Sequence, residues 1–125
     1  ASIDVGLKRI GIAICLTSDI VTPQTAILRK NRNQAARDVN IFLKEWEIEK
    51  LIVGFPSASI DMQNRINHFV SLLELKIPYE FCEANMSSIE AEDLIKGEIK
   101  YKRDGRIDSL AAKIILERYL TKKIS

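Results

Sequence analysis

Hydrophobic and β-branched residues gather in three short segments within the first thirty positions of the chain. These segments, 1–5, 9–16 and 20–28, are separated by Gly-Leu-Lys and Thr-Ser-Asp, which are typical of turns. Strands joined by connections this short pair antiparallel. The pattern therefore predicts an antiparallel meander of three strands at the start of the fold.

Beyond position 30 the apolar spacing changes to the period of a helix and alternates with short apolar runs. Helices are predicted over 33–46, 60–75, 88–96 and 107–120, and strands over 51–55 and 77–83. The third helix begins at the capping box of Ser87 and Glu90 and stops at Gly97. The first and last helices should each bury one apolar face, formed by Ala36, Val39, Phe42, Leu43 and Trp46 and by Ile107, Leu110, Ala111, Ile114, Ile115 and Leu116.

The order of these elements predicts one α/β domain over residues 1–125. A succession of strand, helix and strand requires parallel pairing with a right-handed crossover, whereas the first three strands stay antiparallel. We therefore expect one mixed five-stranded sheet with helices on both faces. Several enzyme folds share this description, so the fold alone does not decide the function.

The net charge of the chain is small but unevenly distributed. Nineteen Lys and Arg against 17 Asp and Glu give a formal charge of +2, too little to indicate a nucleic-acid partner. From residue 96 onward, however, nine basic residues stand against four acidic ones. The C-terminal quarter is therefore the basic part of the molecule.

Three features of the sequence indicate which classes of protein it excludes: its cysteines, its single histidine and the length of its apolar runs. Cys15 and Cys82 lie inside apolar runs, where free cysteine behaves as a small buried hydrophobe, and one histidine, His68, cannot build a metal site. The longest apolar runs are about seven residues, short of the roughly 20 that span a bilayer. We expect a reduced, cytoplasmic protein without membrane association.

Three acidic residues stand where a carboxylate is a candidate for chemistry. Asp4 lies in a strand that is otherwise apolar, where an ionised carboxylate is costly unless it is paired or bound to a cation. Glu83 ends the last strand, and ligand sites of open α/β sheets gather at such ends. Asp108 starts the last helix. The small side chains of Ala111 and Ala112 would let the first turn of this helix pack close to the sheet.

Each acid also has a purely structural interpretation. Asp4 could pair with Lys8 or Arg9, Glu83 could be a solvated carboxylate at a strand end, and Asp108 could cap a helix. If the three converge, they form an oxygen-only site suited to Mg²⁺ or Mn²⁺.

A basic segment at 100–106 adds a second candidate feature. Lys102, Arg103 and Arg106 would hold a nucleic-acid backbone, with Tyr101 available to stack on a base. The same segment could be a solvated run of charge.

Five stretches of the chain form a specific combination. They read IDVGLKRIGIA (3–13), TPQTAILRKN (22–31), LIVGFP (51–56), MSSIEAE (86–92) and RIDSLAAKIILERYL (106–120). In this order, and over essentially the whole chain, the sequence resembles the YqgF/RuvX family of pre-16S ribosomal RNA nucleases, which is related to the RuvC Holliday junction resolvases.

This resemblance implies an RNase H-like fold with strand order 3-2-1-4-5. It also implies a nuclease that depends on a divalent metal and trims the 5′ end of the 16S rRNA precursor. The family acids fall on Asp4 and Asp108, and Lys8 and Arg9 match a loop that would line the same face.

The third acidic motif of the family is altered in this chain. Where the family has Asp-Glu-Arg, this chain has Glu83, Ala84 and Asn85. Glu83 keeps the carboxylate if the family ligand is the first acid, and the ligand is lost if it is the second. The missing arginine also removes a possible phosphate clamp.

The leading hypothesis is a metal-dependent nuclease that acts on structured RNA as a monomer or homodimer. Asp4, Glu83 and Asp108 would be the catalytic metal ligands, and the phosphates would be positioned by Lys8, Arg9, Lys102, Arg103 and Arg106. One alternative is a resolvase of branched DNA, which requires a dimer whose two sites match the junction. A nucleic-acid-binding module that has lost catalysis is the other, because Ala84 and Asn85 replace family residues. An actin-like ATPase needs two domains and does not fit this length.

Overall fold

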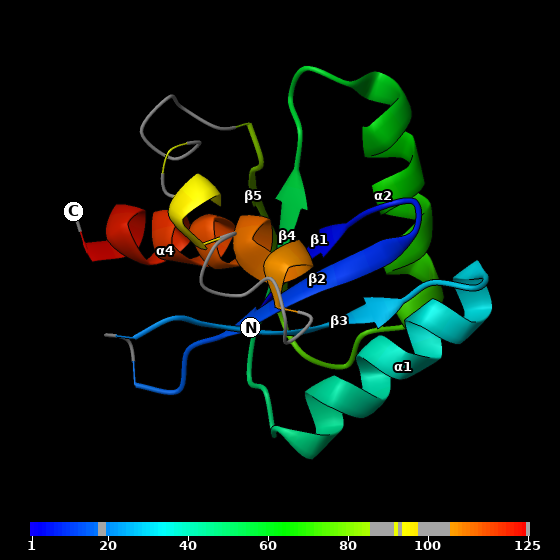
Figure 1. Ribbon diagram of the computed structural model, residues 1–125. Coiled ribbons are helices and arrows are strands. Elements are labelled where there is room, and N and C mark those ends of the chain that lie inside the picture. The colour runs from blue at the N-terminus through cyan, green and yellow to red at the C-terminus, as the bar shows by residue number, and fades with distance from the viewer. Residues whose placement is uncertain (18–19, 86–91, 93, 98–105, 125) are drawn as a thin grey trace.

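Among the residues that the structure describes, there are five strands and three longer helices, shown in Figure 1. The computed structural model describes residues 1–17, 20–85, 92, 94–97 and 106–124. The strands are β1 (Ser2–Val5), β2 (Arg9–Ile14), β3 (Thr22–Leu28), β4 (Leu51–Phe55) and β5 (Tyr79–Glu83). The helices are α1 (Arg32–Glu45), α2 (Ile60–Leu73) and α4 (Leu110–Ile124), and a single 3₁₀ turn, Ile107–Ser109, leads into α4.

The strands form one mixed sheet in the order β3-β2-β1-β4-β5. Strand β1 pairs antiparallel with β2 and parallel with β4, β2 pairs antiparallel with β3, and β4 pairs parallel with β5. The predicted α/β class, the strand order and the antiparallel meander are therefore confirmed. Strand β1 is the central strand, with β2 and β4 on either side of it.

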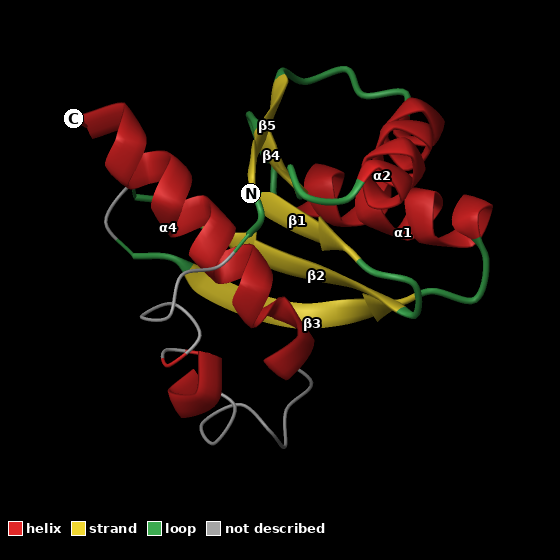
Figure 2. Ribbon diagram, turned by 90° about the horizontal axis from the view of Figure 1, so that it is seen from above, coloured by secondary structure: helices red, strands yellow, loops and turns green. Residues whose placement is uncertain are grey.

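Helices cover the two faces of the sheet unequally, as Figure 2 shows: α1 and α2 lie on one face and α4 on the other. The larger core packs between the sheet and α1 and α2, around Phe69, Val39 and Ile3. The smaller core packs under α4 and joins Ala13 and Ile52 to Ala112, Ile115 and Leu116. Alternate residues of β1 therefore face different helices, with Ile3 and Val5 toward α1 and α2, and Ser2 and Asp4 toward α4.

Local sequence fixes where the first two helices begin. Asn31 and Gln34 form a capping box at the start of α1, and the Ser59 hydroxyl accepts a hydrogen bond from the Met62 N–H at the start of α2. Glu74 ends α2 in the left-handed conformation, with φ of 48°. Among the described residues, no helix is both long and apolar enough to cross a membrane.

Several predictions about burial and boundaries were only partly right. Trp46 is 41% exposed because it caps the C-terminal end of α1, and its ring centroid lies 6.0 Å from that of Phe42. Cys15 and Cys82 are only partly buried.

The last two predicted helices also differ in detail from the expected ranges. The final helix, expected as one element, is divided into the 3₁₀ turn and α4. The helix predicted over 88–96 falls largely outside the described residues. In this region residues 92 and 94–97 are described, and they are helical. Residues 100–105 of the basic segment predicted at 100–106, with Tyr101, Lys102 and Arg103, also lie outside them.

Candidate active site

Asp4 lies on the central strand, on the face that α4 covers. Its neighbour on the same face, Ser2, donates a hydrogen bond of 2.6 Å from its hydroxyl to the Ala112 carbonyl of α4. Burial raises the pKa of Asp4 above its ordinary value. In the described part of the chain, no hydrogen bond or ion pair compensates this carboxylate, so its position fits a group that binds a cation.

The 3₁₀ turn that carries Asp108 rests directly on the strand beside Asp4. Asp4 pairs with Gly11 across β1 and β2. A Cβ atom added to Gly11 would lie 2.3 Å from the Asp108 carbonyl oxygen, so only glycine permits this approach. The absent side chain of Gly11 therefore lets Asp108 settle on the same face as Asp4.

A buried hydrogen bond fixes this turn in place. The Ile12 N–H of β2 donates to the Ser109 hydroxyl at 3.0 Å, and Ser109 is fully buried. The Ser109 N–H in turn donates to the Arg106 carbonyl at 2.9 Å. The backbone around Asp108 is thus held by β2 and by its own turn.

Arg9 pairs with Asp108, and the expectation that it might pair with Asp4 is not met. The Arg9 Nε atom lies 3.4 Å from Asp108 Oδ2, and both side chains are about half exposed. Lys8 is exposed in the turn between β1 and β2. A cation thus lies beside the acidic pair, where a phosphate would approach.

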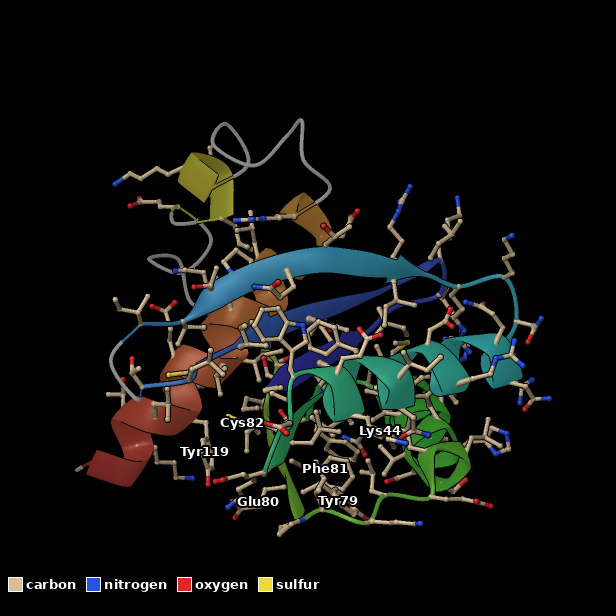
Figure 3. The ribbon with its side chains drawn as sticks, turned by 90° about the horizontal axis from the view of Figure 1, so that it is seen from below. Lys44, Tyr79, Glu80, Phe81, Cys82 and Tyr119 are labelled. Carbon is tan, nitrogen blue, oxygen red and sulfur yellow. The ribbon has the colours of Figure 1, made fainter. Side chains whose placement is uncertain are left out.

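Glu83 lies away from this pair. Strand β5 is two strands from β1, about 10 Å at the usual strand spacing. Figure 3 shows that the β5 side chains alternate, with Glu80 and Cys82 toward α4 and Tyr119, and Tyr79 and Phe81 toward the other face. Glu83 follows Phe81 by two residues and pairs with Phe55, so it belongs to the face of α1 and α2.

The Glu83 carboxylate has other partners. It accepts hydrogen bonds from the Asn85 N–H at 2.9 Å and from the Ser57 N–H at 3.1 Å. The Asn85 N–H and then the Ser57 hydroxyl and N–H hold the pKa of Glu83 below its usual range. In this arrangement Glu83 joins the end of β5 to the loop after β4.

Ala84 is the residue of the altered motif that reaches the face of Asp4. It packs with Cys82 and Ile115 under α4. A Cβ atom added to Gly54 would lie 3.5 Å from the Cβ atom of Ala84. Gly54 follows Val53, the residue that pairs with Ile3, so it is next to Asp4 across β1 and β4. The side of the sheet that holds Asp4 thus carries a methyl group where the family has glutamate.

Two carboxylates with adjoining positions fit the donor set of one magnesium or manganese ion. Such an ion commonly takes one or two carboxylates and completes its shell with water and substrate phosphates. Asp4 supplies an uncompensated carboxylate, and Asp108 lies on the same face. Across the described ranges, no three His, Cys, Asp or Glu side chains lie close enough to hold a metal. Glu83 as a third ligand therefore remains a prediction.

Sequence reasoning missed two residues that build the site. Gly11 had a signal, because a glycine inside an apolar strand often marks a close backbone approach. Ser109 had a weaker one, since a small polar residue beside Asp108 reads equally well as part of a helix start. Of the three residues predicted to contact phosphate in the basic segment, Arg106 is described and is half-buried. Lys102 and Arg103 lie outside the described residues.

Comparison with known proteins gives the family. The family model RuvX, described as a Holliday junction resolvase, matches residues 1–122. A protein of Sulfurovum sp. strain NBC37-1, named "Putative pre-16S rRNA nuclease", is 63% identical over 97% of both chains. Proteins with the same name from Sulfurimonas denitrificans and Helicobacter pylori are 50% and 52% identical, over 98% and 93% of this chain and 96% and 90% of their own. With the sheet order and the Asp4 and Asp108 motifs in place, the chain belongs to the RuvX family.

Proposed function

We propose that this chain is a divalent-metal-dependent nuclease that processes the 5′ end of pre-16S rRNA. The observation that carries the proposal is the placement of Asp4 and Asp108 on one face, brought together by the close approach at Gly11. The names of the relatives support the substrate. On this proposal the protein works in the cytoplasm, where ribosomal RNA matures.

Asp4 and Asp108 would hold Mg²⁺ or Mn²⁺ in this site. The bound ion supplies Lewis acidity toward the phosphate and lowers the pKa of a coordinated water. The two carboxylates come from a central strand and from a turn bonded to β2, so their backbones are fixed before substrate arrives.

The cations beside the acids orient the substrate. Arg9 lies against Asp108, and its remaining N–H groups would bind an incoming phosphate. Lys8, exposed in the same turn, adds a positive charge to this approach. Their role is to place the scissile phosphodiester over Asp4 and Asp108.

Cleavage of a 16S precursor fragment in the presence of Mn²⁺ tests this proposal. We expect Asp4→Asn and Asp108→Asn each to reduce the cleavage rate more than about 100-fold, beyond the loss typical of an outer-shell partner. Asp61→Asn, which removes an exposed carboxylate from α2, serves as the matched control and should cleave normally. Cleavage that survives both site variants would exclude this assignment.

Two other functions have specific support. The family description favours cleavage of four-way DNA junctions. That reaction needs a dimer whose two sites match the junction symmetry, so a monomeric protein that cleaves RNA argues against it. Ala84 favours a nucleic-acid-binding module without catalysis. RNA binding without measurable affinity for Mn²⁺ would favour that module over both enzymes.

A further inference from the structure

Three arginines from three elements gather beside the turn that follows Asp4. Arg29 directly follows β3, Arg32 is the first residue of α1, and Arg65 lies on α2. The end of β3, the start of α1 and the turn between β1 and β2 lie at the same end of the sheet in Figures 1 and 2. This cluster of Arg29, Arg32 and Arg65 was not selected from the sequence, because its members are spread over 37 positions of the chain.

Arg29 is the fixed member of the cluster. Its Nη1 atom donates to the Gly6 carbonyl at 2.8 Å, and its backbone N–H donates to the Lys8 carbonyl at 2.9 Å. The guanidinium lies 5.7 Å from the centre of the Phe69 ring, a cation–π contact. Arg65 precedes Phe69 by one helical turn and so lies on the same side of α2. The geometry holds Arg29 against the turn two residues beyond Asp4.

The cluster is a concentration of uncompensated positive charge. Burial and then the neighbouring charges of Arg32 and Arg65 lower the pKa of Arg29. In the described part of the chain, no carboxylate lies within 4.0 Å of any of the three guanidinium groups. Lys30 and Lys8 are both exposed; Lys30 follows Arg29 in the chain, and the Lys8 carbonyl accepts the hydrogen bond from the Arg29 N–H. Like charges held together in this way repel one another in the free protein and stabilise a bound polyanion.

We infer that this basic surface binds the phosphate backbone of a single-stranded RNA segment that leads into the Asp4 and Asp108 site. The inference rests on the proposed function and adds a path for the substrate on the side of α1 and α2. Guanidinium groups bind phosphate oxygens through paired N–H donors. Contacts of this kind position a strand without reading its bases. Arg29 joins this surface to the site because its partner Gly6 lies in the turn that ends β1.

Binding of a short fluorescein-labelled oligouridylate, measured in EDTA at several salt concentrations, tests the inference without cleavage. The cluster variant is Lys30→Gln, Arg32→Gln and Arg65→Gln together, all exposed positions, with Arg29 retained because it holds the turn. The control variant is Arg37→Gln, Lys44→Gln and Lys76→Gln, which removes three positive charges from exposed positions elsewhere. Circular dichroism checks that both variants fold.

We expect the cluster variant to bind roughly tenfold or more weakly, since three charge-assisted contacts are lost. The slope of log Kd against log salt should fall by about 2, at about 0.7 for each lost phosphate contact with a single strand. The control variant should keep the slope of the wild type. Equal losses in both variants, or none in either, would overturn the inference.

A separate cleavage assay keeps this inference distinct from the proposed function. If the wild type does not cleave the 16S precursor but the cluster variant alone loses oligouridylate binding, the nuclease proposal fails and the RNA path stands. If the wild type cleaves and the cluster variant binds and cleaves as well as the control, the RNA path is wrong and the nuclease proposal stands.

Discussion

The carboxylate of Asp4 occupies a place where its own charge is unfavourable. It lies on the central strand under α4, and burial raises its pKa. A carboxyl whose pKa is higher in the folded protein than in the unfolded chain opposes folding once the unfolded chain ionises. The fold therefore keeps a destabilising group at the position where a cation would be stabilised most.

We predict that Asp4→Asn makes the metal-free protein more stable at neutral pH. The gain should be fully present above the raised pKa of the folded state and should vanish as the pH falls below the ordinary value of 3.8, where both states are protonated. Its size is about 1.4 kcal/mol for each unit of pKa difference. Thermal melts between pH 3 and pH 8 measure it.

A bound metal ion should reverse the order of stability of the wild type and Asp4→Asn. Added Mn²⁺ should raise the Tm of the wild type by binding the folded state, and it should have little effect on Asp4→Asn. A wild type that is already more stable than Asp4→Asn in EDTA at neutral pH would contradict the prediction.

A second residue-scale prediction concerns Ala84, the methyl group on the face of Asp4. We expect Ala84→Glu to add a carboxylate beside Asp4 and to increase the affinity for Mn²⁺, because hard cations gain from each anionic oxygen ligand. Titration calorimetry with Mn²⁺ measures the change. Ala58→Glu, which adds the same charge in the exposed loop after β4, is the matched control. Equal affinity in the two variants would show that position 84 does not face the metal.

Successive residues of a strand face opposite sides of the sheet. The sequence could therefore identify the altered motif but could not predict which of its residues faces Asp4. The sequence identifies Glu83 as the remaining acid of the altered motif, and it identifies Ala84 as the neighbouring substitution. Which of the two faces Asp4 depends on the register of β5 against β4, and one residue of shift exchanges the faces. Motif spacing carries no information on that register, because every residue of β5 except the half-buried Cys82 is exposed, so burial does not single out one face.

At the scale of elements, the 3₁₀ turn before α4 is the part that completes the candidate site. It has only three residues, and its hold on β2 comes from the Ser109 hydroxyl and from the space at Gly11. The sequence predicts a helix here because the apolar spacing of α4 continues back to Ile107. The tighter first turn follows from the contact with β2, which only the assembled sheet reveals.

We predict that Ser109→Ala loosens this turn. The Ile12 N–H would be left buried without a partner, at a cost of about 1–3 kcal/mol, and the cleavage rate should fall about 10- to 100-fold as Asp108 loses its position. Denaturant unfolding and precursor cleavage measure the two effects.

Ser2→Ala provides the comparison for this turn. It removes a hydroxyl that binds the Ala112 carbonyl, farther along α4, and should cost about 0.5–1.5 kcal/mol with little change in cleavage. Similar cleavage losses in the two variants would mean that the whole of α4, rather than the turn, positions Asp108.

At the scale of the whole molecule, the two cores share the same strands. Ile3 and Val53 belong to the core under α1 and α2, and their neighbours Ser2 and Ile52 face α4. Loss of either helix layer therefore exposes strands that the other layer needs. Such an arrangement favours one cooperative unfolding transition.

We predict that Phe69→Ala lowers the free energy of unfolding by about 3–5 kcal/mol while the transition stays single. Fluorescence of Trp46 at the end of α1 and far-UV circular dichroism should report coincident curves. Phe81→Ala, at a position 41% exposed, should cost far less. Separate transitions in the two signals would show that the two layers unfold independently.

The sequence predicted the architecture of the fold but not the arginine cluster on its surface. Apolar periodicity and short connections predict one mixed five-stranded sheet, because burial of alternate residues leaves few arrangements. The order of its strands was predicted from the resemblance to the family. The gathering of Arg29, Arg32 and Arg65 depends instead on how α1 and α2 approach the turn after β1. No local pattern encodes that approach.

Asp4 and Asp108 lie near opposite ends of the chain, and the ribosome makes them in that order. The five strands and the helices α1 and α2 all precede residue 84, so they are synthesised before the segment with Asp108. The two acids meet only after α4 has emerged and covered the sheet. On the proposed function, a nascent copy therefore acquires its complete candidate metal site only after the segment with Asp108 and α4 has been made.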